Sequence, residues 1–251
     1  MVGQLLWRGM LAGLIAGLFA AGIAFVAGEG SVDRAIAFES AAARAAGEPE
    51  EPEIVSREVQ RSVGLATAGA LYGVGLGGFF ALAFAFVNGR VGRLEPRAVA
   101  ALVALAGFLV MGLAPWFKYP PNPPSVGQPD TIGLRTQLYF GLVVWSALTA
   151  IVASLVYGRA AARIGGWGAG LLAVALALVS YAVAAAVLPP INEVPENFPA
   201  DLLWRFRVAS LGAQAGFWAA LGLAYGALVA RLPGFDFASR RADAPARYAA
   251  F

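Results

Sequence analysis

The stretch LLWRGMLAGLIAGLFAAGIAFVA, residues 5–27, decides the fold class of this chain. Its one charged residue, Arg8, lies near its beginning, and the rest is apolar or glycine. A helix needs about 20 such residues to cross the apolar core of a bilayer. The stretch lacks the alternation of a membrane strand. Because Ala20-Ala21-Gly22 lies inside the apolar run rather than after it, we interpret the run as a retained membrane span and not as a cleaved leader.

Further stretches of the same kind follow along the chain. About 59% of the 251 residues are hydrophobic and only 13% are charged, whereas soluble domains carry about 25% charged residues. We therefore predict an all-α integral membrane protein, a polytopic bundle of six transmembrane helices forming a single domain over 1–231, with a flexible cytoplasmic tail at 232–251. The predicted spans lie at about 5–27, 60–87, 98–114, 136–157, 167–188 and 208–230.

The basic residues predict the orientation, because short cytoplasmic loops are enriched in Lys and Arg. Arg90 and Arg159 lie in the shortest connections, which obey this rule best. With both termini cytoplasmic, the inner segments hold ten of the 18 basic residues and three of the 15 acidic ones. The long connections, at about 28–59, 115–135 and 189–207, then form a structured outer face. The net negative charge of this face would attract cations.

The residue types exclude most enzyme chemistry. The chain has no cysteine and no histidine, so it can hold no HExxH zinc motif, no Ser-His-Asp triad and no thiolate site. The run GVGLGG at 73–78 lies inside a predicted span and follows no strand, which argues against a dinucleotide fingerprint. We expect no enzyme activity, no firmly implied cofactor and no nucleic-acid partner.

Small residues recur at every fourth position in three predicted spans. Such spacing lets helix backbones approach closely in lipid. The favoured interpretation is helix packing within one bundle, and the alternative is a sliding seam or a partner surface. The positions are Gly9, Gly13, Gly17, Gly69, Gly73, Gly77, Gly212, Gly216 and Ala220.

The third long connection contains INEVPENFPADLLWRFR, residues 191–207. Carboxylate and amide oxygens on a loop stiffened by proline suit a divalent cation. The candidate metal ligands are Asn192, Glu193, Glu196 and Asn197. The favoured alternative is a solvated acidic loop, in which Asp201 caps the next helix or pairs with Arg205 four residues later.

Other polar residues of the outer face are candidates for a gate or a funnel. They are Asp33, Glu39, Lys118, Tyr119, Asn122, Asp130, Arg135, Asp201, Arg205 and Arg207. Inside the spans, Gln214 is the leading polar candidate, and its alternative role is a hydrogen bond between helices.

The run WFKYPPNPP, residues 116–124, combines an aromatic belt with a stiff loop. Prolines fix φ and need no donor, so they order a loop at little entropic cost. Lys118 is expected either to snorkel or stack on a ring, or to form a salt bridge with Glu193 or Glu196.

The first long connection is predicted to contain a short amphipathic helix over residues 31–44, SVDRAIAFESAAAR, because its apolar positions follow helical spacing. Ser31 or Asp33 is a candidate N-cap. Glu29 and Asp33 share one face of a helix only if it begins before Gly30, and the glycine favours a later start.

Four runs resemble the CbtA family of proposed cobalt transporter subunits, and the resemblance extends over nearly the whole chain. They are VDRAIAFE (32–39), SREVQRSVGL (56–65), FKYPPNPPSVGQPDTIGLRTQLYF (117–140) and INEVPENFPADLLWRFRVASLG (191–212).

The resemblance implies a multi-pass protein of the bacterial cytoplasmic membrane, linked to cobalt uptake for cobalamin synthesis. It also implies a partner, CbtB, a small single-span subunit that bears histidines. It supplies no ligand residues for this chain.

Cobalt(II) favours imidazole, which this chain lacks. The partner could supply it, the ion could pass hydrated as a transient cobalt or other divalent cation, or the substrate could be a corrinoid. A non-transporting accessory or assembly subunit of a larger membrane complex is the alternative function.

Overall fold

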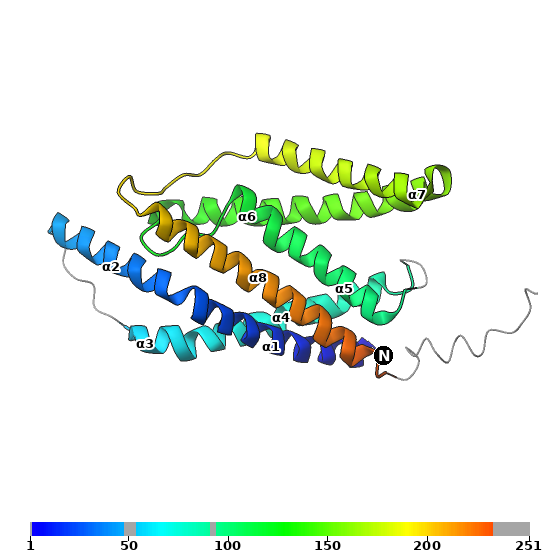
Figure 1. Cartoon of the computed structure of the whole chain (residues 1–251), viewed down its shortest axis with the longest axis horizontal. Helices are drawn as coiled ribbons and strands as arrows, with labels where there is room; N and C mark the ends of the chain where they lie inside the picture. Colours follow the sequence, from blue (N-terminus) through cyan, green and yellow to red (C-terminus); the bar gives the residue numbers. More distant parts are fainter. Residues whose placement is uncertain (1, 48–53, 91–93, 233–251) are drawn as a thin grey trace, which may run out of the picture. The chain divides into compact units, whose positions relative to one another are not determined.

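A computed structural model describes residues 2–47, 54–90 and 94–232, and within these ranges the chain is helical without any strand (Figure 1). Five of the described helices are long and apolar enough to cross a membrane. They cover Val2–Ala27, Arg57–Val87, Pro96–Lys118, Pro129–Val187 and Ala200–Val229. The predicted all-α membrane class is confirmed. The proposed tail at 232–251 lies, beyond Leu232, outside the described residues.

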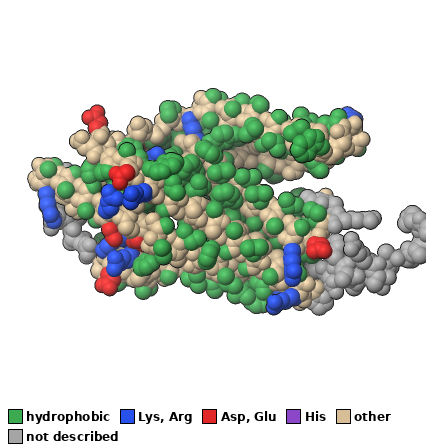
Figure 2. Space-filling view, viewed as in Figure 1, with side chains coloured by type: hydrophobic (Ala, Val, Ile, Leu, Met, Phe, Trp, Pro, Cys, Tyr) green, Lys and Arg blue, Asp and Glu red, His purple; other side chains and the backbone are tan. Residues whose placement is uncertain are grey.

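Hydrophobic side chains cover much of the face drawn in Figure 2, and the charged ones gather toward helix ends. Leu71, Phe79 and Leu223 are each at least 70% exposed. A helix that turns such side chains outward over its whole length suits lipid rather than water.

The chain divides into two compact units, and we describe each by itself. Unit 1 contains Met1–Gly22, Glu58–Leu105 and Gly216–Phe251, and unit 2 contains Ile23–Arg57 and Ala106–Ala215. The predicted single domain over 1–231 stays a prediction.

Unit 1 is built on a glycine seam between α1 (Val2–Ala27) and α4 (Leu65–Val87). Gly9, Gly13 and Gly17 of α1 lie against Gly77, Gly73 and Gly69 of α4, and a Cβ added at any of the six would come closer than 3.0 Å to the opposite backbone. The predicted packing role of these two sets is confirmed.

The end of α8 (Ala200–Val229) completes unit 1. Tyr225 is fully buried between Phe80 and Phe84, with ring centroids 5.2 and 5.1 Å away. On α8 the close glycine contacts are made by Gly222 and Gly226, against α5 (Pro96–Gly107). Gly212 of the predicted seam meets nothing within 4 Å.

Unit 2 begins its helices with α2 (Glu29–Ala46), which confirms the predicted amphipathic helix. The expected late start was wrong, because the helix begins at Glu29, and its N-cap is Gly28 without a side-chain cap. Glu29 and Asp33 therefore do share a face, and both pair with Arg57. The helix ends at Gly47 in the left-handed conformation.

The third predicted span continues past Pro115, where we expected it to end. A π-helical segment, η2 (Phe108–Leu113), leads into α6 (Ala114–Lys118), and Pro115 lies in the first turn of α6. The proline has no N–H to donate to the Met111 carbonyl four residues earlier, and this oxygen accepts from the Tyr139 hydroxyl at 3.1 Å instead. The loop consequently starts at Tyr119. A short 3-10 helix, η3 (Pro129–Thr131), ends it.

The fourth and fifth predicted spans are the two arms of α7 (Ile132–Val187). The helix is interrupted at Gly165, where φ is 75° and ψ is 163°, a conformation confined essentially to glycine. The arms lie side by side (Figure 1) and are tied by Ser180, whose Oγ lies 2.9 Å from Trp145 Nε1 and 2.7 Å from Thr149 Oγ1.

Candidate functional site

The two proline-rich loops of unit 2 contact one another. The Tyr119 hydroxyl donates to the carbonyl oxygen of Pro189 at 2.8 Å, and the Gln128 amide donates to Glu193 Oε2 at 2.8 Å. Burial raises the pKa of the Tyr119 phenol, so the hydroxyl stays a donor at physiological pH.

Glu193 is the anchor of this loop contact. Arg135 Nε lies 3.6 Å from Glu193 Oε2, and only 12% of the Glu193 side chain is exposed. The Thr131 hydroxyl, the Gln128 amide and, less strongly, Arg135 hold the pKa of the carboxyl below its ordinary value, against the opposing effect of burial. The carboxylate is thus already occupied by donors from the neighbouring loop.

The other predicted metal ligands lie in separate surroundings. Asn192 Oδ1 accepts from the Val194 amide at 3.5 Å. Glu196 and Asn197 are exposed on a turn closed by the Phe198 amide and the Pro195 oxygen, 3.0 Å apart. Within the described ranges no three acidic side chains group as a metal site. The cation-gathering role of the four residues stays a prediction.

Lys118 does not form the predicted salt bridge with Glu193 or Glu196. Its Nζ donates to the Ala185 oxygen at 2.7 Å and lies 5.9 Å from the centroid of the Tyr119 ring. Ala185 has one of the last four carbonyls of α7, which have no intrahelical partner and carry the negative end of the helix dipole. The expected ring stacking is confirmed, and the charge caps a helix end instead of a carboxylate.

Asp201 also has a partner other than the predicted one. It lies in the first turn of α8, and its Oδ2 is 3.5 Å from Arg34 of α2 rather than paired with Arg205. Both side chains are more than half exposed, so the pair contributes little stability. It borders the apolar cluster that joins α2 to both loops. That cluster contains Ala35, Val126, Phe198 and Leu202.

Three further candidates of the outer face lie apart from these contacts. Glu39 is exposed on α2, Asp130 is exposed in η3, and Arg205 is exposed on α8. Arg205 lines a second hollow beside Arg34 and Trp204. The structure brings none of the three to the loop contact at Glu193.

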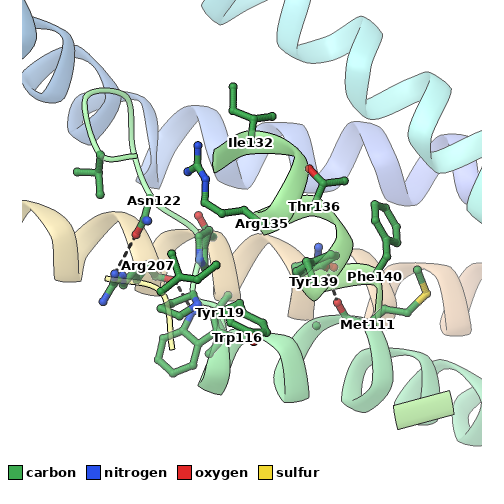
Figure 3. A pocket seen from close by; sticks show the side chains of 18 residues that line it. Met111, Trp116, Tyr119, Asn122, Ile132, Arg135, Thr136, Tyr139, Phe140 and Arg207 are labelled. Carbon is green, nitrogen blue, oxygen red and sulfur yellow. Dashed lines mark hydrogen bonds between the residues drawn. The ribbon is translucent and has the colours of Figure 1, made fainter. Parts of the chain in front are cut away.

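A cavity of about 510 Å³ lies in unit 2, between η2 with α6, the beginning of α7 and α8 (Figure 3). Arg207, Ser210 and Gln214 come from one face of α8, since their spacing is three and four residues. The polar side chains that line the cavity are Tyr119, Asn122, Arg135, Thr136, Tyr139, Arg207, Ser210 and Gln214.

The run WFKYPPNPP, residues 116–124, holds one wall of this cavity against α8. Trp116 Nε1 donates to the Arg207 carbonyl oxygen at 3.0 Å, and Arg207 Nη2 donates to Asn122 Oδ1 at 2.8 Å (Figure 3). The Tyr139 hydroxyl donates to the Met111 oxygen of η2 at 3.1 Å. A π-helical turn misaligns carbonyls from the usual ladder, and such turns are frequent at functional sites.

Three buried polar atoms of the lining have no hydrogen-bond partner among the described residues. They are Nε of Arg135, Nε of Arg207 and Oε1 of Gln214. The sequence analysis singled out all three residues, but it missed Trp116, Tyr139 and the Met111 carbonyl as parts of one site. The spacing of Arg207, Ser210 and Gln214 was the available signal for a shared face.

Neither the comparison with curated proteins nor that with solved structures found a match. The sequence model of one family, described as "Probable cobalt transporter subunit (CbtA)", matches residues 2–230. The match includes every described helix and both loops at the cavity. It concerns a transporter-subunit family rather than an enzyme family, and it agrees with the resemblance seen in the sequence runs. With nearly the whole chain matched and five described helices long and apolar enough to cross a membrane, this multi-pass membrane protein belongs to the CbtA family.

Proposed function

We propose that this chain is a subunit of a cobalt or related divalent-metal transporter in the bacterial cytoplasmic membrane. The single observation that carries the proposal is the family match over residues 2–230. The five long apolar helices are what such a subunit requires.

The proposed topology has six crossings, with both termini cytoplasmic. Its support is the interruption of α7 at Gly165, which turns one long apolar helix into two arms joined through Ser180. Each arm supplies the roughly 20 residues that a crossing needs. The turn carries Arg159 and Arg163, which agrees with a cytoplasmic location.

On the outer face, Glu196 and Asn197 are the ligands we expect to gather the cation, with Glu193 and Asn192 beside them. Their exposure leaves their oxygens available, whereas Glu193 is held by the neighbouring loop. Because the chain has no imidazole, we expect a small histidine-bearing single-span partner to complete the coordination.

An accessory role without transport is the second candidate, and one observation favours it. In α7 only 6% of the most apolar window is buried within the chain, against 28–39% in the other long helices. The exposed surface of these two helical arms could pack against the helices of a partner protein as well as against lipid.

Uptake of radiolabelled cobalt by cells that express this chain with its partner tests the proposal. We expect Glu196→Gln to lower uptake severalfold at unchanged membrane expression, and Glu95→Gln, on the opposite predicted face, to leave it unchanged. If deletion of the chain leaves uptake intact and the protein purifies with a larger membrane complex, the transporter subunit is refuted and the accessory role remains.

A further inference from the structure

The cavity of unit 2 has a positive lining, which the proposed function does not use. Arg135 and Arg207 are its two charged side chains, and no acidic residue lines it. Arg135 is offset by Glu193 at 3.6 Å. Arg207 has only the neutral amide of Asn122 as a side-chain partner within the described residues, so its charge is not compensated there.

The unused hydrogen-bonding capacity of the lining follows α8. Nε of Arg207 and Oε1 of Gln214 are buried without a partner. The two residues are seven apart, which places them about 10 Å apart along the helix axis, with Ser210 between them on the same face. A buried polar group without a partner is costly. Anionic oxygens of a ligand would accept from the Arg207 Nε–H, and a hydroxyl of the same ligand would donate to Gln214 Oε1.

The chemistry of these groups selects an oxyanion. A guanidinium offers donors in a planar fork that matches carboxylate and phosphate oxygens. Ser210, Thr136 and the Gln214 amide add hydroxyl and amide groups that donate to further oxygens. The cavity volume of about 510 Å³ lies within the range of about 300–1,000 Å³ for small-molecule sites. A bare divalent cation, in contrast, would face Arg207 with no carboxylate beside it.

We propose that this cavity is a binding site for a small carboxylate or phosphate oxyanion that also carries a hydroxyl, with its anionic oxygens on the Arg207 guanidinium and its hydroxyl donating to Gln214 Oε1. The Asn122 contact and the Trp116 bond to the Arg207 backbone position the guanidinium (Figure 3). The site does not depend on the proposed function.

Calorimetric titration of the full chain in neutral detergent with phosphatidylcholine tests the site. Citrate and inorganic phosphate are the probes, with chloride at equal ionic strength as the blank. We expect saturable binding that Arg207→Gln weakens at least about tenfold, because a charge-assisted pair is lost. Arg205→Gln is the matched control, since it removes a charge two residues away that lines the other hollow. Gln214→Leu, which keeps the ion contacts of the loops, is expected to weaken binding severalfold and serves if the Arg207 variant does not fold.

A second arm separates soluble anions from lipid headgroups. Thermal stabilisation is measured for the chain with phosphatidylglycerol or phosphatidylcholine added, in the natural protein and in Arg207→Gln. Stabilisation by phosphatidylglycerol that only the natural protein shows assigns the site to a lipid phosphate. Binding of citrate or phosphate without it assigns the site to a soluble anion. If neither arm exceeds its blank, or if Arg205→Gln weakens binding as much as Arg207→Gln, the proposal is overturned.

Discussion

Replacing Gly13 with alanine is the sharpest test of the seam between α1 and α4. A Cβ at this position would lie 2.8 Å from the Gly73 carbonyl carbon and 2.9 Å from the Gly77 Cα, whereas ordinary contacts begin at 3.4 Å. Both neighbours are backbone, which cannot rotate away as a side chain can. The Gly73 carbonyl oxygen would lie closer still, so the two helices must separate by about 1 Å or more.

The cost follows from the contacts that this separation weakens. A gap of 0.5–1 Å forfeits a quarter to a half of the dispersion energy of each contact, and overpacking of cores costs about 1–3 kcal/mol. We expect Gly13→Ala to lower the free energy of unfolding by an amount in that range. Gly75→Ala, on α4 with nothing within 4 Å, is the control, and it gains up to about 1 kcal/mol from helix propensity.

Unfolding by titration with sodium dodecyl sulfate, followed by circular dichroism, measures both variants. The double variant Gly13→Ala/Gly73→Ala adds a second check, because helices that are already apart tolerate the second methyl group at less than the additive cost. Equal stability of Gly13→Ala and Gly75→Ala would refute the reasoning, as would strict additivity in the double variant.

Three further variants test other contacts. Arg57→Gln removes the partner of two carboxylates on α2. We expect this change to lower the free energy of unfolding by about 1 kcal/mol after allowance for partial exposure. Arg61→Gln, exposed on the same helix, is the control and should change the free energy of unfolding little. The pKa of Glu193 is lowered in the folded chain, so the stabilising effect of its carboxylate is complete above the ordinary pKa of 4.5 and is lost as pH falls through the folded value. The difference in melting temperature between the natural chain and Glu193→Gln should therefore shrink on acidification below pH 4.5. A difference that stays constant would contradict the pairing. Gly165→Ala forces a positive φ on alanine and should lower the free energy of unfolding in detergent by about 1–3 kcal/mol. Gly158→Ala is the control, because the added Cβ meets nothing within 4 Å. Equal effects of the two changes would mean that the turn can straighten.

Hydropathy was sufficient to predict the helices, because each long apolar run has only one way to satisfy its backbone in lipid. Hydropathy did not predict where the helices begin and end. Hydropathy missed the first turns of α8, which begins at Ala200 and not at residue 208, because these turns carry charged side chains such as Asp201, which pairs with Arg34 of α2. The third span runs through Pro115 because the Met111 carbonyl, to which a proline cannot donate, accepts from the Tyr139 hydroxyl of a distant segment instead.

The site could be predicted only as separate residues. Arg207 and Gln214 stand out in the sequence as polar groups at or inside a span. Their partners come from segments far away in the chain, such as Asn122, 85 residues from Arg207. Glu193 shows the same limit, since its spacing in an acidic loop suggests a metal ligand, whereas its actual surroundings are a backbone amide and Arg135. Composition gives the charge of a loop and not which charges neutralise one another.

The run WFKYPPNPP explains why substitutions on α8 are the better probes of the cavity. Each polar side chain of the run binds another element of unit 2: Trp116 and Asn122 bind Arg207, Lys118 binds the end of α7, and Tyr119 binds the third loop. Removing any of these would loosen the loop and the cavity together, so lost binding would not distinguish a ligand contact from a structural one. Gln214 makes no described hydrogen bond through Oε1, so its replacement by leucine removes an acceptor that the cavity offers to a ligand. A loss of oxyanion binding in that variant, at unchanged melting temperature, therefore isolates recognition from folding.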